Sequence, residues 1–98
     1  MQRDEAIRAL RANADQLADY GVARLAVFGS VARNEAMAGS DVDVLVEFRP
    51  EARIGLFEFA RLRRYLMEIL GCEVDLVTPE ALRPSMRESI LREAVYAG

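Results

Sequence analysis

The sequence contains no histidine and no lysine, and it has a single cysteine. Histidine is the usual general base near neutral pH and the commonest zinc ligand, so its absence removes both from any chemistry of this chain. Acid–base or metal chemistry must then use carboxylates, which prefer hard ions such as Mg²⁺ or Mn²⁺. The lone Cys72 excludes an intramolecular disulfide and a cysteine-rich metal site, and its apolar neighbours predict a buried structural thiol.

Long hydrophobic runs are also absent. No apolar stretch approaches the roughly 20 residues that a membrane-spanning helix needs, and the N-terminus lacks the apolar core of a signal peptide. We therefore expect a cytoplasmic protein with no membrane partner. The formal net charge of −3 argues against broad nucleic-acid binding, which usually requires a basic face. A chain of 98 residues has room for one hydrophobic core, so we expect a single domain over residues 1–98.

The spacing of apolar residues predicts helices and strands in alternation along the chain. The predicted helical segments cover residues 4–19, 30–34, 55–70, 78–82 and 85–96. The predicted strands cover residues 23–28, 41–48 and 72–78. This order predicts an α+β fold in which a three-stranded sheet is flanked by helices, with sheet edges open to a partner.

The most informative segment joins the first two predicted strands. Gly29-Ser30 follows the first strand, and after ten intervening residues Asp41-Val42-Asp43 opens the second. Glycine permits a tight turn, and the free backbone N–H groups together with the serine hydroxyl can hold phosphate oxygens. An unpaired buried carboxylate costs roughly several kcal/mol, so two acids one residue apart on a buried strand point to a bound cation.

A third carboxylate lies in the last predicted strand. Asp41 and Asp43 share one strand face, roughly 6–7 Å apart by the rise per residue. Asp75 has apolar neighbours and becomes a third ligand if its strand lies beside theirs. Three carboxylates beside a phosphate-holding turn are typical of two-metal phosphoryl or nucleotidyl transfer. Asp75, on the metal next to the attacking hydroxyl, would then accept the hydroxyl proton.

The remaining polar residues near these segments have either a functional or a structural interpretation. Arg33 either reaches a phosphate or covers the surface of a helix. Ser40 either contacts the nucleotide or caps the loop before Asp41, and capping is favoured. Glu47 is interpreted as solvated or salt-bridged. A solvated helix face is favoured over a binding patch for Arg61, Arg63 and Arg64.

These residues resemble a known family. Gly29-Ser30, ten residues, Asp41-x-Asp43 and then Asp75 in Val-Asp-Leu-Val-Thr-Pro-Glu-Ala-Leu are similar to the minimal nucleotidyltransferases of the DNA polymerase β superfamily. The resemblance extends from the first helix through the Ile90-Leu-Arg-Glu-Ala94 tail. It implies a small mixed β-sheet flanked by helices. Asn34 stands where such proteins commonly have glycine, and because asparagine tolerates a left-handed conformation we expect the turn to survive.

The resemblance also implies an activity and its residues. The activity is transfer of NMP from an NTP in Mg²⁺, with two ions expected and Mn²⁺ as an alternative. Metal binding would fall to Asp41, Asp43 and Asp75, which would also be the catalytic triad. Nucleotide binding would fall to Gly29, Ser30, Arg33 and Ser40.

The length of the chain indicates which members of the family it resembles most. Larger relatives carry an additional domain for the acceptor, whereas a stand-alone core resembles the minimal nucleotidyltransferase antitoxins that pair with a HEPN-domain toxin ribonuclease. That resemblance implies transfer of AMP from ATP to a tyrosine of the toxin. Two alternatives stay open, a non-catalytic antitoxin that acts by occlusion and an oligomeric nucleotidyltransferase that modifies a small-molecule hydroxyl.

Overall fold

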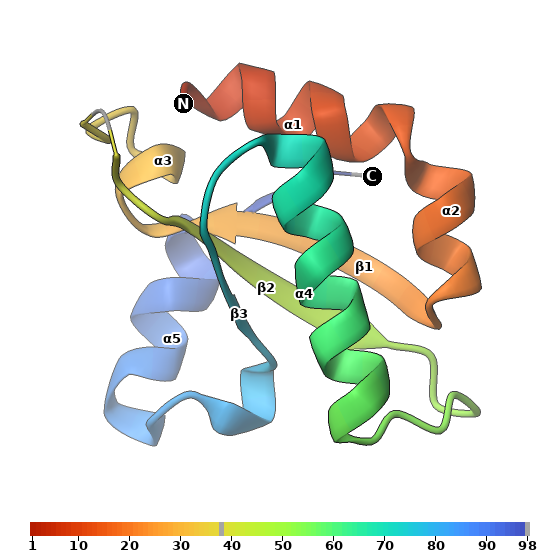
Figure 1. Ribbon diagram of the computed structural model, residues 1–98. Helices are drawn as coiled ribbons and strands as arrows, with labels where there is room; N and C mark the ends of the chain where they lie inside the picture. Colours follow the sequence, from red (N-terminus) through yellow and green to blue (C-terminus); the bar gives the residue numbers. More distant parts are fainter. Residues whose placement is uncertain (38, 98) are drawn as a thin grey trace.

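A four-stranded mixed sheet forms the centre of the computed structural model, which describes residues 1–37 and 39–97 (Figure 1). The strand order is β3-β2-β1-β4, with β1 antiparallel to both β2 and β4 and β2 parallel to β3. The strands are β1 (Val22–Phe28), β2 (Val42–Phe48), β3 (Val74–Val77) and β4 (Val95–Tyr96). The helices are α1 (Arg3–Ala12), α2 (Ala14–Asp19), α3 (Gly29–Ala32), α4 (Leu56–Leu70) and α5 (Pro84–Glu93), with a 3-10 turn η1 (Pro79–Ala81).

Each face of the sheet packs against a different set of helices. In β2, Val42, Val44 and Val46 point into the larger core, which α1, α2 and α4 complete. Leu45 points to the opposite face and packs into a smaller core with residues of β1, α5 and the segment after η1. Figure 1 shows α4 in front of the sheet and α5 to the lower left. Because side chains alternate along a strand, Asp43 lies on the Leu45 face, the side that α5 covers.

The first predicted helix is broken in the structure. Its apolar spacing continues from 4 to 19, yet α1 ends at Ala12 and α2 begins at Ala14. The Asn13 side chain donates to the Ala9 carbonyl at 2.8 Å and accepts from the Tyr65 hydroxyl at 3.1 Å. Asparagine favours such side-chain contacts at helix ends over helix interiors. The prediction of one continuous helix was therefore wrong.

The end of the chain also differs from the prediction. The last helix stops at Glu93, and Val95 and Tyr96 pair with Val27 and Ala26 as β4. The Ala97 N–H continues this pairing by donating to the Leu25 carbonyl at 2.9 Å. β-Branched and aromatic residues suit the otherwise open edge of β1. The α+β prediction is confirmed, but the sheet has four strands instead of three.

The expected burial of Cys72 needs correction. Cys72 is half-buried and packs against the larger core, so it is less buried than predicted, and this burial raises the pKa of its thiol.

Arg61, Arg63 and Arg64 are exposed, as expected of a solvated helix face. Arg63 also makes a structural contact, because its Nε donates to the Val74 carbonyl at 2.9 Å and its Nη2 pairs with Glu73 at 3.2 Å. This contact ties α4 to β3. In residues 1–37 and 39–97, no helix has the length and apolarity to cross a membrane.

The Arg63 contact predicts a difference between neighbouring arginines. Replacing Arg63 by alanine should lower the free energy of unfolding by about 1 kcal/mol, because the Val74 carbonyl loses its charged donor. The change corresponds to a decrease in Tm of about 4–8 °C for a domain of this size. Thermal unfolding followed by circular dichroism measures it. Arg64→Ala, which changes an exposed residue of the same helix, controls for helix propensity and should change Tm little. Equal decreases in Tm for the two variants would contradict a stabilising contact between Arg63 and β3.

Candidate functional site

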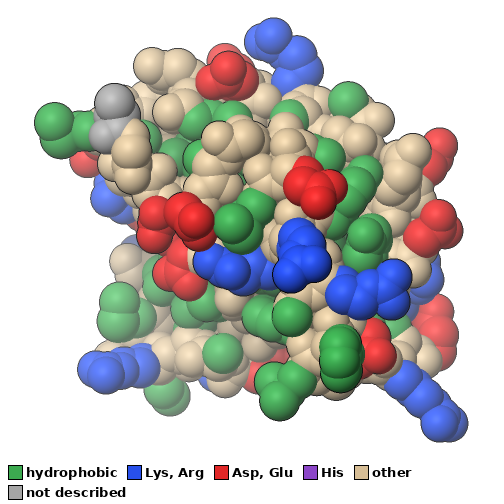
Figure 2. Space-filling model, in the orientation of Figure 1, with side chains coloured by type: hydrophobic (Ala, Val, Ile, Leu, Met, Phe, Trp, Pro, Cys, Tyr) green, Lys and Arg blue, Asp and Glu red, His purple; other side chains and the backbone are tan. Residues whose placement is uncertain are grey.

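The register of β2 and β3 brings two of the three acids together. Asp43 is paired with Asp75 across these parallel strands, so their Cα atoms are about 4.8 Å apart by strand spacing. Asp41 immediately precedes β2, and the Val42 N–H donates to the Glu73 carbonyl at 3.0 Å. The condition under which Asp75 could join Asp41 and Asp43, that its strand lies beside theirs, is therefore met. All three acids lie at the end of the sheet where β2 and β3 begin, and Figure 2 shows acidic side chains gathered at the left of the molecule in that region.

The glycine of the Gly-Ser turn lies directly against the central acid. β1 ends at Phe28, which is paired with Asp43, and Gly29 then turns the chain into α3 with φ +72°. A Cβ added to Gly29 would overlap with Asp43 Oδ2 and lie 3.1 Å from its Cγ. The Asp43 carboxylate therefore fills the space that any other side chain would need. Glycine is required here for backbone conformation and for close approach.

The acids differ in burial, which corrects part of the sequence argument. Asp41 and Asp75 are exposed, and only Asp43 is partly buried. Partial burial raises the pKa of the Asp43 carboxyl above its usual value, and the negative charges of Asp75 and Asp41 raise it further. Arg33 opposes this shift only in part. The unfavourable burial expected for all the acids therefore applies to Asp43 alone.

This donor set suits a hard divalent cation. Three carboxylates that repel one another, with no nitrogen or sulfur ligand among them, match the oxygen preference of Mg²⁺ and Mn²⁺. A cation bound among them would offset the repulsion between the carboxylates and favour the ionised form of Asp43. Among residues 1–37 and 39–97, no three acidic or cysteine side chains are close enough to hold one ion as they stand. Sharing an ion would therefore require Asp41 and Asp75, whose side chains are exposed, to rotate toward Asp43.

The remaining predicted site residues surround the turn. Arg33 donates from Nη1 to Glu93 Oε2 at 3.0 Å and from Nε to Glu35 Oε2 at 3.3 Å, and these carboxylates raise its pKa. Its charge is thus already neutralised by two partners. The Ser40 hydroxyl accepts from the Met37 N–H at 3.1 Å, which is the capping contact favoured from the sequence. Glu47 is salt-bridged to Arg24 as expected, and its Oε2 also accepts a hydrogen bond from the Tyr96 hydroxyl at 3.1 Å.

Asn34 adopts the left-handed conformation expected of it. Its φ is 57°, the one positive value outside glycine in the described residues. Its side-chain oxygen also accepts from the Arg3 N–H at 3.0 Å, which ties α1 to the end of α3. The turn therefore survives the replacement of the usual glycine.

Sequence reasoning missed one residue of this region, Glu93. Its Oε1 accepts from the Gly29 N–H at 3.0 Å, and its Oε2 accepts from Arg33. The sequence places Glu93 inside a predicted helix, 64 residues from Gly29, with no local signal of such a contact. The packing of α5 against β1 and α3, together with the pairing of β4 with β1, places it beside the turn.

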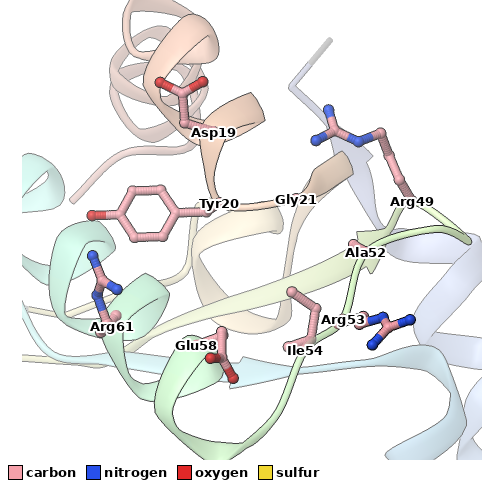
Figure 3. A pocket seen from close by; sticks show the side chains of 9 residues that line it. All are labelled: Asp19, Tyr20, Gly21, Arg49, Ala52, Arg53, Ile54, Glu58 and Arg61. Carbon is pink, nitrogen blue, oxygen red and sulfur yellow. The ribbon is translucent and has the colours of Figure 1, made fainter.

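A separate cavity lies near the opposite end of β1, and we call it the arginine-lined cavity (Figure 3). Its volume is about 520 Å³, and it is formed by Asp19, Tyr20, Gly21, Arg49, Ala52, Arg53, Ile54, Glu58 and Arg61. None of the predicted site residues is among them. Arg49 already donates to the Ala18 carbonyl and pairs with Glu51. Because Arg53 and Arg61 also line the cavity, it offers a competing location for an anionic ligand, away from Asp41, Asp43 and Asp75.

Comparison with known proteins decides the family. The nucleotidyltransferase domain family matches residues 7–97, nearly the whole chain. The chain belongs to this family. The resemblance stated from the Gly-Ser and Asp-x-Asp residues is confirmed, and the protein is an enzyme of the nucleotidyltransferase class.

Individual relatives agree with this membership. Protein adenylyltransferase MntA of Thermococcus cleftensis is 44% identical over 77 residues, covering 79% of this chain and 76% of the relative. A candidate protein adenylyltransferase of Methanocaldococcus jannaschii is 46% identical over 79 residues, covering 81% and 83%. A solved structure described as a candidate minimal nucleotidyltransferase superposes with a TM-score of 0.78 at 43% identity, covering 97% of this chain and 95% of that one.

More distant structures share the fold alone. A toxin–antitoxin structure with AMP-PNP superposes with a TM-score of 0.68 at 18% identity, covering 100% of this chain and 73% of that one. A complex of a tri-AMPylated Shewanella oneidensis HEPN toxin with an MNT antitoxin superposes with a TM-score of 0.64 at 16% identity, covering 94% and 71%.

Proposed function

We propose that this protein is a Mg²⁺-dependent adenylyltransferase that transfers AMP from ATP to a hydroxyl group of a partner protein, with residues 1–98 acting as one catalytic domain. The observation that carries the proposal is the β2–β3 register, which sets Asp43 beside Asp75 next to the Gly29-Ser30 turn. The family membership of the chain supports the reaction class.

The chain's own residues divide the chemistry between them. Asp41, Asp43 and Asp75 would hold Mg²⁺, or Mn²⁺, which when bound neutralises triphosphate charge and makes the acceptor hydroxyl more acidic. The Ser30 hydroxyl and the backbone N–H groups that follow Gly29 bind phosphate oxygens, since the Gly29 N–H itself donates to Glu93. Asp75, exposed at the start of β3, accepts the proton of the acceptor hydroxyl. The hydroxyl oxygen bonds to the α-phosphorus, the bond to the bridging oxygen breaks, and pyrophosphate leaves.

The proposed acceptor is a tyrosine hydroxyl of a HEPN-type toxin, which would make this protein the cytoplasmic antitoxin of the pair. The curated relatives that are 44% and 46% identical are named as protein adenylyltransferases, which supports a protein acceptor. The shared fold of the complex that contains a tri-AMPylated HEPN toxin supports the choice of partner. The formal net charge of −3 favours a protein partner over nucleic acid, although Figure 2 shows basic side chains in a band across the middle of the face that α4 covers.

The proposal is tested by incubating the protein with Mg²⁺ and α-labelled ATP in a lysate of the source cells. A labelled protein band that is absent with γ-labelled ATP is the expected result, because only the α-phosphate is transferred. Mass spectrometry of the band then identifies the partner and the modified side chain. Label on a metabolite would favour a small-molecule acceptor, and toxin neutralisation without any transfer would favour occlusion.

The raised pKa of Asp43 predicts the pH dependence of the reaction. As the pH falls, Asp43 is protonated before an ordinary aspartate, and a protonated carboxyl is a poor metal ligand. Mg²⁺ affinity and transfer rate should therefore both begin to decrease at a higher pH than the protonation of an ordinary aspartate would cause. Isothermal titration with Mg²⁺ at a series of pH values below neutrality measures the affinity, and a decrease that begins only where an ordinary aspartate is protonated would contradict the assignment.

A further inference from the structure

Glu93 connects the two ends of the phosphate-binding turn with one carboxylate. Oε1 accepts from the backbone N–H of Gly29 and Oε2 accepts from Arg33 Nη1, each at 3.0 Å. Both distances are typical of good hydrogen bonds to an ionised acceptor. Gly29 begins α3 and Arg33 follows its last residue, so the contact spans the whole of this short helix. The Glu93 side chain is only 28% exposed, which limits competition from water.

The backbone around Glu93 is itself fixed. Glu93 is the last residue of α5, and β4 pairs with β1 two residues later. The Ala97 carbonyl also accepts from Arg11 Nε at 2.8 Å. These contacts link the end of α5 to the sheet and to α1. Glu93 is thus presented to the turn from a rigid support and not from a mobile tail.

Gly29 depends on outside contacts to fix its conformation, because glycine has more backbone conformations open to it than other residues. Its φ is +72°, and the Asp43 carboxylate lies where a Cβ of Gly29 would be. With Glu93 at its N–H and Asp43 at its Cα, Gly29 is held from two directions. The position of Ser30, the next residue, depends on this restraint.

We propose that Glu93 is a positioning residue that holds the Gly29-Ser30 turn in its nucleotide-binding conformation, acting through Gly29 and Arg33. This inference rests on the proposed binding of ATP at that turn. A turn fixed before binding loses less conformational freedom when the triphosphate arrives, so affinity is higher. The alternative is that Glu93 competes with the triphosphate for the same donor groups. Removal of Glu93 would then lower the KM for ATP instead of raising it.

The test compares Glu93→Ala and Glu93→Gln with wild type in steady-state transfer and in titration with Mg²⁺ and ATP. Glu93→Ala should raise the KM for ATP about tenfold and change kcat less than about threefold, because the acids are untouched. Glu93→Gln should show a smaller rise in KM, since its amide oxygen still accepts from the Gly29 N–H. Glu88→Ala is the matched control, because Glu88 lies on the same helix and pairs with the exposed Arg92.

Several outcomes would overturn the inference. A KM equal to that of wild type in Glu93→Ala would show a structural role only, and a lower KM would show competition with the triphosphate. Circular dichroism confirms that each variant is folded, and Glu93→Gln supplies the result if Glu93→Ala is not. Failure of wild type to bind ATP would contradict the proposed function and the inference together, whereas normal binding by Glu93→Ala contradicts the inference alone.

Discussion

Replacing Asp43 by asparagine should reduce kcat/KM for nucleotidyl transfer by at least about 10³-fold, because a bound metal contributes several kcal/mol to the transition state. Asp43 is the acid that contacts Gly29, pairs with Asp75 and is partly buried. Asparagine keeps the shape of the side chain and removes its charge. The loss should appear in kcat, and ATP binding without Mg²⁺ should change little.

The same substitution should stabilise the protein at neutral pH. A raised pKa means that the folded state binds the Asp43 proton more tightly than the unfolded chain does. The contribution of Asp43 to the free energy of unfolding therefore falls as the pH rises from the pKa of an unfolded aspartate through the raised pKa of the folded state. It remains low at higher pH, which includes neutral pH. Because Asp43 is only partly buried and solvent screens its charge, we expect a small rise in Tm.

Both effects are measured on one preparation, by transfer assay and by thermal unfolding without metal. Asp15→Asn, which removes a carboxylate from the exposed surface of α2, is the control and should leave transfer unchanged. A stabilised but inactive Asp43→Asn variant would show that Asp43 is kept for function. Full activity in this variant would remove Asp43 from the proposed metal site.

Gly29→Ala has the second large expected effect. The left-handed backbone costs an alanine roughly 1–2 kcal/mol, and the added Cβ overlaps with the Asp43 carboxylate. Asp43 must move away from the turn, and a displacement of about 1 Å can cost about 100-fold in rate. We expect transfer to fall by at least that factor and Tm to fall by several degrees. Transfer assays and thermal unfolding of the purified variant measure the two quantities.

Gly71→Ala separates the two causes. Gly71 ends α4 with φ +71°, nearly the value of Gly29, but a Cβ there meets no atom within 4 Å. This variant should lose comparable stability from backbone strain while it retains transfer. If Gly71→Ala and Gly29→Ala lost activity equally, the close approach of Gly29 to Asp43 would have no special role.

The sequence predicted the part of the candidate site that depends on local patterns. Strand alternation placed Asp41 and Asp43 on one strand face, and the apolar neighbours of Asp75 indicated a strand that could lie beside theirs. Glycine chemistry predicted the tight turn. Each of these features depends on a pattern only a few residues long, so it can be recognised without knowledge of the tertiary fold.

The features that could not be predicted depend on contacts between distant residues. Asn13 interrupts the first helix because Tyr65, 52 residues away, donates to its side chain. Glu93 reaches Gly29 because α5 packs against β1 and α3 and two residues of β4 cover the edge of β1. A two-residue strand after a helix carries no periodicity of its own. Long-range pairing therefore decided both the fourth strand and the extra site residue.

Whether ATP binds at the Gly29-Ser30 turn is tested most directly by locating Mn²⁺–ATP on the protein through paramagnetic broadening of backbone amide signals in NMR spectra. Mn²⁺ is an alternative ion for the proposed site, and it broadens signals from nearby nuclei. Binding at the turn predicts selective loss of the amide signals of Ser30, Asp43 and Asp75, and recovery of these signals in Asp43→Asn. Selective broadening around the arginine-lined cavity, with the turn unaffected, would contradict it.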